Sequence, residues 1–183
     1  MAGKTAKRPC EADLEALRQR IREAFPPTAY KGEVTACRCA ECNQIKRDFR
    51  RKSWDQVSAE AIDLTESPVL FHEVEAVHAF LPAFLLRALD DLDEKTTVLE
   101  MTIYSISPCT EDVERRSDSP EFEQMRVTRL RRLHQMLSPS QLRVLRDFLV
   151  FAGDYSASAD WYRPYISRAL NEIYLEAEPD EPS

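Results

Sequence analysis

The sequence predicts a mainly α-helical protein, a single-domain irregular bundle of about six helices with at most one short strand or hairpin. Only three glycines occur among 183 residues, too few for the tight turns of barrels, sandwiches or phosphate-binding loops. Apolar residues recur at helical spacing in most segments. The hydrophobic share of 43% is that of an ordinary globular protein, which argues against global disorder.

Four helices are expected in the first half of the chain. The first ends at Pro26-Pro27, since proline cannot continue the hydrogen-bond ladder of a helix. The strongest pattern is an apolar stripe from Val74 to Ala88, which predicts the central helix of the fold. The predicted helices span residues 11–24, 43–52, 58–64 and 72–89.

The second half contains one ambiguous segment and three expected helices. Residues 96–106 are rich in β-branched side chains, which favours a strand or irregular structure. The motif SPSQ at 138–141 is a helix start signal, with a capping serine, a proline at the first position and a glutamine that bonds back. The helices on either side of this short link should form a hairpin. The expected helices span residues 119–137, 139–152 and 160–175.

One helical domain is expected over residues 10–175, between a flexible basic tail (1–9) and a flexible acidic tail (176–183). No apolar run approaches the roughly 20 residues that a membrane span needs. The lysines near the start are not followed by the apolar region of a secretory signal. We therefore expect a cytoplasmic protein without a membrane partner, in a compartment where disulfides are rare.

Three of the five cysteines, Cys37, Cys39 and Cys42, form a CxCxxC cluster. Two cysteines separated by two residues are a usual pair of zinc ligands, because a turn aims both sulfurs at one point. Cys37 adds a third sulfur, so the cluster predicts a structural Zn²⁺ site. No second motif identifies the fourth ligand. The candidates are His72, His78, Cys109, His134 and Glu41.

Other uses of these cysteines stay open. Reduced cysteines often pack as small hydrophobic residues without further function. Cys39 and Cys42 also have the spacing of a redox dithiol, although the βαβ context of thioredoxin-like sites is missing. Glu75 and His78 match half of a di-iron carboxylate motif, but no second half occurs.

The chain shows no sequence motif of a common enzyme class. A serine elbow, a Walker loop and a dinucleotide-binding glycine pattern are all absent from the sequence. Enzymatic activity therefore has no positive support at this level, and we lean towards a protein without catalysis.

Two basic segments, 46–52 and 126–132, are candidates for nucleic-acid binding, since Lys and Arg clusters contact phosphate. Charge runs are more often solvated helix faces. The formal net charge of −7 also argues against a general nucleic-acid binder. Nucleic acid is therefore the less favoured partner.

Several motifs taken together resemble a family of uncharacterised bacterial proteins described as a domain of unknown function. They are the CxCxxC cluster, the pair Ser53-Trp54, the FLPAFLL segment at 80–86 and the SPSQ motif at 138–141. The likeness covers about residues 21–151 and departs at His78. It implies a bacterial, cytoplasmic, single-domain protein, and it brings no catalytic residue.

The leading functional hypothesis is a non-catalytic interaction or adaptor protein that binds another protein. The missing catalytic motifs, the acidic net charge and the compact cysteine cluster support it. The first alternative is a metal- or thiol-dependent enzyme that uses Cys37, Cys39 and Cys42. The second alternative is a nucleic-acid-binding protein that uses the two basic segments.

Overall fold

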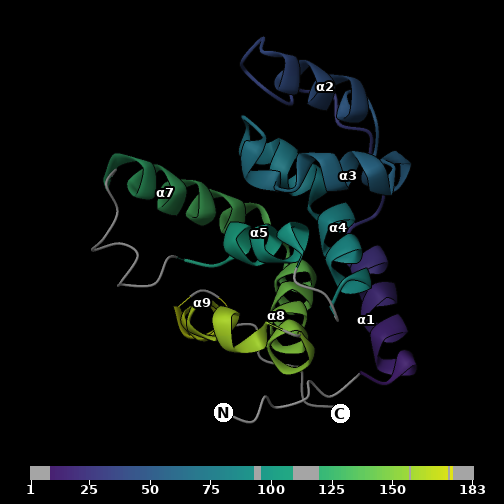
Figure 1. Ribbon diagram of the computed structural model, residues 1–183, viewed down its shortest axis with the longest axis vertical. Helices are drawn as coiled ribbons and strands as arrows, with labels where there is room; N and C mark the ends of the chain where they lie inside the picture. The colour runs from purple at the N-terminus through teal and green to yellow at the C-terminus, as the bar shows by residue number, and fades with distance from the viewer. Residues whose placement is uncertain (1–8, 93–95, 109–119, 157, 173, 175–183) are drawn as a thin grey trace.

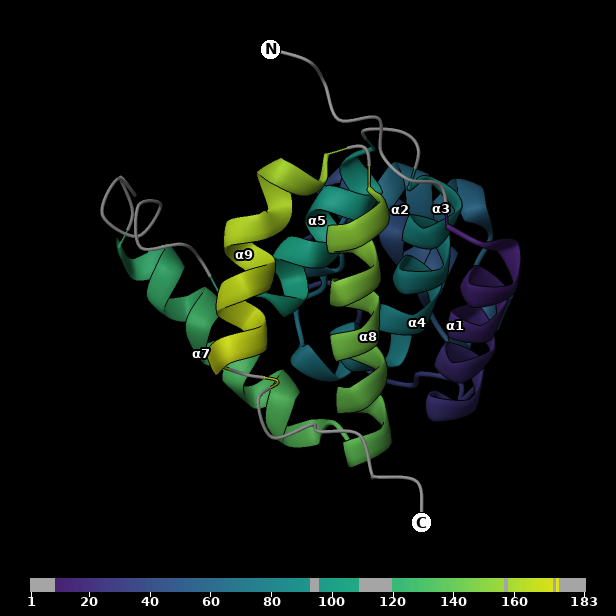
Figure 2. The same cartoon turned by 90° about the horizontal axis from the view of Figure 1, so that it is seen from below.

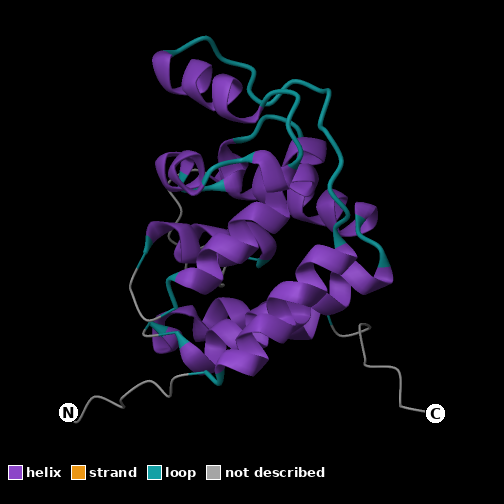
Figure 3. Cartoon of the chain, turned by 90° about the vertical axis from the view of Figure 1, so that its right-hand side faces the viewer, coloured by secondary structure: helices purple, strands orange, loops and turns teal. Residues whose placement is uncertain are grey.

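The chain is mainly helical in the part that the computed structural model describes, residues 9–92, 96–108, 120–156, 158–172 and 174, with only the backbone of 120–123 considered. Within these residues no β-strand occurs, as Figure 3 shows, so the mainly α prediction is confirmed. Eight α-helices and two 3₁₀ turns are present in this part: α1 (Glu11–Ala24), α2 (Ala40–Phe49), η1 (Trp54–Gln56), α3 (Ala59–Thr65), η2 (Pro68–Leu70), α4 (Val74–Asp90), α5 (Thr97–Ile106), α7 (Pro120–Met136), α8 (Pro139–Tyr155) and α9 (Ala159–Glu172).

Helix α4 is the element on which much of the chain packs. Its buried residues cover most of the helix circumference, because neighbouring elements pack on it from several directions. Helices α1, α3, α5 and α7 and the turns η1 and η2 all contact it (Figure 1). The stripe from Val74 to Ala88 thus lies at the centre of the core, and the helix continues through Pro82.

The strand expected at residues 96–106 is wrong: these residues form helix α5. Thr96 caps the helix, and its hydroxyl accepts a hydrogen bond from the backbone N–H of Leu99 at 3.4 Å. The apolar side chains of α5 recur at helical spacing and are buried against α4 and α9. Tertiary packing therefore outweighs the β-propensity of the branched residues.

The hairpin expected from helices α7 and α8 is also wrong. The two helices follow each other directly in the chain but diverge, as Figure 2 shows. Helix α7 packs on α4, whereas α8 packs along α9 and α1. The apolar surfaces of α4 and α9 determine where each helix lies, so a short link does not make the two helices pack side by side.

A cluster of phenylalanines attaches α2 to the core. Phe49, the last residue of α2, is completely buried. Its ring centroid lies 5.0 Å from that of Phe71 and 5.1 Å from that of Phe80, in edge-to-face arrangements. It also stacks on Phe84 at 6.3 Å. Edge-to-face pairs add stability beyond the buried area, so α2 is held firmly at its C-terminal end.

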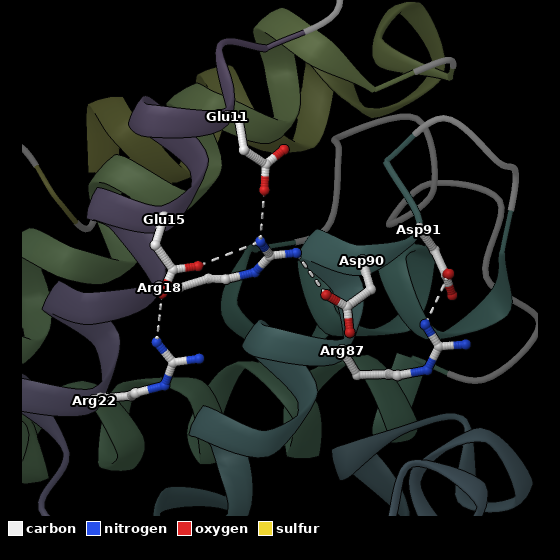
Figure 4. A network of polar contacts seen from close by, with 7 residues as sticks. All are labelled: Glu11, Glu15, Arg18, Arg22, Arg87, Asp90 and Asp91. Carbon is white, nitrogen blue, oxygen red and sulfur yellow. Dashed lines mark hydrogen bonds and ion pairs between the residues drawn. The ribbon is translucent and has the colours of Figure 1, made fainter.

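Ion pairs join α1 to the C-terminal end of α4. Arg18 on α1 contacts Asp90 at 2.6 Å and Glu15 at 3.5 Å (Figure 4). Arg87 contacts Asp91 and, at 2.7 Å, Asp63 of α3. Exposed pairs of this kind contribute little stability individually, and these connect the C-terminal end of α4 to α1 and α3.

Buried polar contacts hold two other segments. The indole Nε1–H of Trp54 donates to the carbonyl of Phe25 at 2.8 Å, which ties η1 to the end of α1. Tyr174, beyond the end of α9, is buried, and its hydroxyl donates to the carbonyl of Ile106 at 3.1 Å. Burial raises the pKa of Tyr174, so this hydroxyl stays a donor.

The two expected tails, 1–9 and 176–183, lie almost entirely outside the described residues. None of the helices in the described part combines the length and the apolar character that crossing a membrane requires.

Candidate metal centre

Helix α2 begins earlier than the sequence predicts, and this places the cysteines. It starts at Ala40 rather than at Asn43, so Cys39 is the N-cap residue and Cys42 lies in the first turn. The Sγ atom of Cys39 accepts a hydrogen bond from the N–H of Cys42 at 3.4 Å, as a capping side chain does. The three cysteines therefore converge at the positive end of the α2 dipole, which favours negatively charged sulfur.

The three sulfur atoms are close enough to share one ion. The Sγ atoms of Cys37, Cys39 and Cys42 all lie within 4.8 Å of one another. Those of Cys37 and Cys39 are 2.9 Å apart. Tetrahedral zinc with Zn–S bonds of about 2.3 Å has sulfurs about 3.8 Å apart. Shifts of about 1 Å in exposed side chains therefore suffice to reach that geometry.

Hydrogen bonds from neighbouring side chains order the loop that carries the sulfurs. The Thr35 hydroxyl donates to the carbonyl of Cys42 at 3.3 Å, and the Lys46 Nζ donates to the carbonyl of Cys37 at 3.1 Å. The side-chain amide of Asn43 donates to the carbonyl of Arg38 at 3.1 Å. Sequence reasoning missed these supporting residues. The only sequence feature that could have indicated their role is that all of them lie within ten residues of the cluster.

Backbone hydrogen bonds anchor the loop before the cysteines and the turn after α2. The N–H of His72 donates to the carbonyl of Val34 at 2.8 Å, and the N–H of Tyr30 donates to the carbonyl of Lys52 at 2.9 Å. Val34 is buried. The cysteine segment is thus attached to the core on both sides, while Cys37 and Cys39 remain exposed.

The sulfurs differ in their acidity. Hydrogen bonding to the thiol of Cys37, and then to the N–H of Cys42, lowers the pKa of Cys39. The hydrogen bonds with Cys37 and Cys39 raise the pKa of Cys42 to about 11. Negative charge in the cluster is therefore favoured on Cys39 over Cys42. A thiolate in this position is suited to start metal binding.

The candidates for a fourth ligand are not gathered around the sulfurs. Within the described residues, the three cysteines form the only group of His, Cys, Asp and Glu side chains close enough to hold a metal. His78 lies 3.4 Å from the side chain of Gln141, and His134 packs on the ring of Tyr174. Both are thus engaged with other elements.

The remaining candidates differ in their position. Glu41 is exposed in the first turn of α2, but its carboxylate does not join the sulfur group. Cys109 lies outside the described residues. The His72 imidazole is about half exposed and contacts Glu73 at 3.3 Å. Its backbone N–H donates to the carbonyl of Val34, three residues before Cys37, so the fold ties His72 to the segment that leads to the cluster.

The basic segment 126–132 is largely engaged within the fold. Arg126 is buried and Arg129 is half-buried, and both donate to backbone carbonyls. Burial lowers the pKa of Arg129. Arg132 pairs with Glu75. These guanidinium groups hold α7 against its neighbours.

No protein-family model, curated protein or solved structure matches this chain. The resemblance to a bacterial family described above therefore stays a prediction, and the functional argument rests on the geometry of the site.

Proposed function

We propose that the protein is a non-catalytic interaction protein whose cysteine cluster binds Zn²⁺. One observation supports this most directly: three sulfur atoms from a six-residue segment lie within 4.8 Å of one another at the start of a helix. Thiolate ligands favour zinc, copper(I) or iron–sulfur clusters, and a single mononuclear set of this spacing is most often a zinc site. The ion would hold the segment that leads into α2.

Two arrangements complete the tetrahedron around such an ion. In the first, the exposed imidazole of His72 leaves Glu73 and turns towards the sulfurs. In the second, a water molecule or a ligand from outside the chain takes the fourth position. A His72→Ala variant separates them. A tenfold or greater loss of zinc affinity supports the first arrangement, and an unchanged affinity supports the second.

Metal content is the decisive measurement. Protein purified without chelator should contain about one zinc per chain by elemental analysis, and Cys39→Ser should lose it. Cys10→Ser is the matched control, because Cys10 is also exposed but lies outside the cluster. Wild-type protein without metal, or equal zinc in both variants, would contradict the proposal.

A thiol-dependent function is the main competitor, since the sulfurs of Cys37 and Cys39 are only 2.9 Å apart. The same preparation tests it. Three freely titrating thiols without zinc, together with oxidation to a disulfide by a mild oxidant, would favour thiol chemistry and overturn the zinc site.

The C-terminal end of α2 and the turn that follows it support the interaction role. Arg47, Arg50 and Arg51 form a basic face there: all three are exposed, and none forms an ion pair with a carboxylate of the described residues. α2 stands at one end of the molecule, as Figures 1 and 3 show, so this basic face is accessible. An acidic protein surface is the complementary partner.

The partner class is testable with simple probes. A fluorescent poly-glutamate peptide should bind at low salt, and an Arg47→Glu, Arg50→Glu double variant should weaken that binding. If an oligonucleotide binds more tightly than the peptide at equal ionic strength, the protein is a nucleic-acid binder instead. We further propose a cytoplasmic location, because a reducing compartment keeps the thiols available as ligands.

A further inference from the structure

Helices α4, α5 and α7 and the turn η2 border an apolar cavity of about 220 Å³. Val74 and Val77 of α4 and Leu130 and Leu133 of α7 are buried and line it. The volume lies below the roughly 300 Å³ at which pockets for drug-sized ligands usually begin. The cavity therefore suits a small or narrow apolar group.

Two exposed apolar side chains stand at the edge of this cavity. Leu70 of η2 is 45% exposed and Met125 of α7 is 49% exposed, and both are lining residues, so the cavity reaches the surface there. A methionine side chain is flexible and adapts to the shape of what it contacts. Aliphatic walls gain when an aliphatic chain replaces the water against them.

The cavity carries positive charge. Two guanidinium groups line it, and no Asp or Glu is among its described lining residues. Arg126 is buried and engaged, since it donates to the carbonyls of Tyr104 and Ser107 at 2.9 Å and lies over the Tyr104 ring. Arg129 is thus the guanidinium that can receive a ligand.

Arg129 is held in place, but its charge is not paired. It donates to the carbonyl of Val69 at 3.3 Å and to that of Phe71. A guanidinium has five N–H donors, and Arg129 forms no ion pair with a carboxylate of the described residues. Burial lowers its pKa, and the Glu73 carboxylate offsets this only in part. A carboxylate from outside would supply the counter-charge through charge-assisted hydrogen bonds.

We propose that this cavity binds a small, free aliphatic carboxylic acid, with its chain among the buried valines and leucines and its carboxylate on Arg129. The net charge of −7 repels anions from the protein as a whole, so attraction of a carboxylate has to come from a local site. The cavity shares no residue with the cysteine cluster, so its test is independent of the zinc proposal.

Three probes separate the role of the aliphatic chain from that of the charge. Octanoate has both, octanamide has the same chain with a neutral head of similar shape, and acetate has the charge alone. Isothermal titration of the whole protein should show octanoate binding roughly tenfold more tightly than octanamide and roughly a hundredfold or more tightly than acetate. Equal or tighter binding of octanamide or acetate, or no octanoate binding at millimolar concentration, would overturn the proposal.

Arg129→Gln tests the charged group. It should weaken octanoate binding about tenfold and leave octanamide binding within about twofold, since only the carboxylate uses the charge. Arg132→Gln is the matched control, because Arg132 lies on the same helix, pairs with Glu75 and is not among the lining residues. Equal losses of octanoate binding in both variants would mean that the general charge of α7 attracts the anion, which contradicts the proposed site.

A second variant keeps the test decisive if Arg129→Gln loses its fold, because Arg129 also holds η2 through two carbonyls. A thermal melt detects such a loss. Ser105→Leu fills the cavity from α5 and leaves every charge in place. It should weaken the binding of octanoate and of octanamide alike by tenfold or more. Undiminished octanoate binding by folded Ser105→Leu protein would exclude this cavity as the site.

Discussion

Phe49 links α2, the helix that carries Cys42, to the core, so a single side chain determines how this helix is attached. It ends α2, whose first turn holds Cys42, and its ring packs among three other phenylalanines. The apolar character of Phe49 is readable from the sequence, but its three ring partners lie 22 or more positions away. Only the folded chain brings them together.

Replacing Phe49 by alanine should destabilise the protein by about 3–5 kcal/mol, since the change leaves a cavity in a closely packed site. Val150→Ala on α8 is the control, because Val150 is 39% exposed and should cost less than about 1 kcal/mol. Urea unfolding followed by circular dichroism measures both. A cost below about 1 kcal/mol for Phe49→Ala would mean that α2 is not anchored by this cluster.

The cysteine cluster was also readable at the residue scale. The spacing of Cys37, Cys39 and Cys42 is local, so a turn is enough to bring their sulfurs together. The supporting contacts of Thr35 and Lys46 could not be predicted, because they depend on where α2 starts. The fourth ligand could not be predicted either, since it depends on long-range folding.

At the scale of elements, the helix caps were the most predictable feature. Ser138 and Gln141 form the expected capping box, with the Gln141 N–H donating to the serine hydroxyl at 3.2 Å and the Ser138 N–H donating to the glutamine side chain at 2.9 Å. Such signals act over three residues. The identity of α5 and the direction of α7 depend on what these helices pack against. Local propensity therefore misled the prediction of α5, and the short link between α7 and α8 misled the prediction of their hairpin.

Ser138→Ala should destabilise the protein by about 1 kcal/mol, because it leaves the N–H groups at the start of α8 without their side-chain acceptor. Ser140→Ala is the control from the same turn. The Ser140 hydroxyl contacts only that of Ser138, so both bonds of the capping box survive its removal. Chemical denaturation should separate the two variants. Equal losses would show that the box contributes nothing specific.

The misreading of α5 also hid a cavity that residues of α5 and α9 line. In a strand, Glu100 and Tyr104 lie on one face but about 13 Å apart. In a helix they are one turn apart and face the same side. Nothing in the sequence showed that Trp161 and Tyr165 of α9 line a cavity together with these two residues of α5.

At the scale of the whole molecule, zinc should raise the melting temperature only slightly. Ligand at 100 times its Kd adds about 2.7 kcal/mol when it binds the folded state alone, or roughly 5–10 °C for a chain of this size. The three sulfurs are neighbours in sequence, so the unfolded chain keeps much of the affinity. We expect a shift below about 5 °C by scanning calorimetry.

A larger shift would contradict this expectation, since it requires a ligand supplied by a distant element of the folded chain. His72→Ala would then abolish the excess. The Cys39→Ser variant, scanned with and without zinc, gives the baseline for both outcomes.

The buried ring of Tyr174 sets where a recombinant version of this domain can be cut. The last helix ends at Glu172, and a designer who trims at the helix end would remove a side chain that fills the interior. The carbonyl of Ile106 would lose its hydrogen bond, and the ends of α5 and α7 would lie open to water. A fusion partner or affinity tag therefore belongs after Tyr174, with a spacer that leaves this residue free to fold inward.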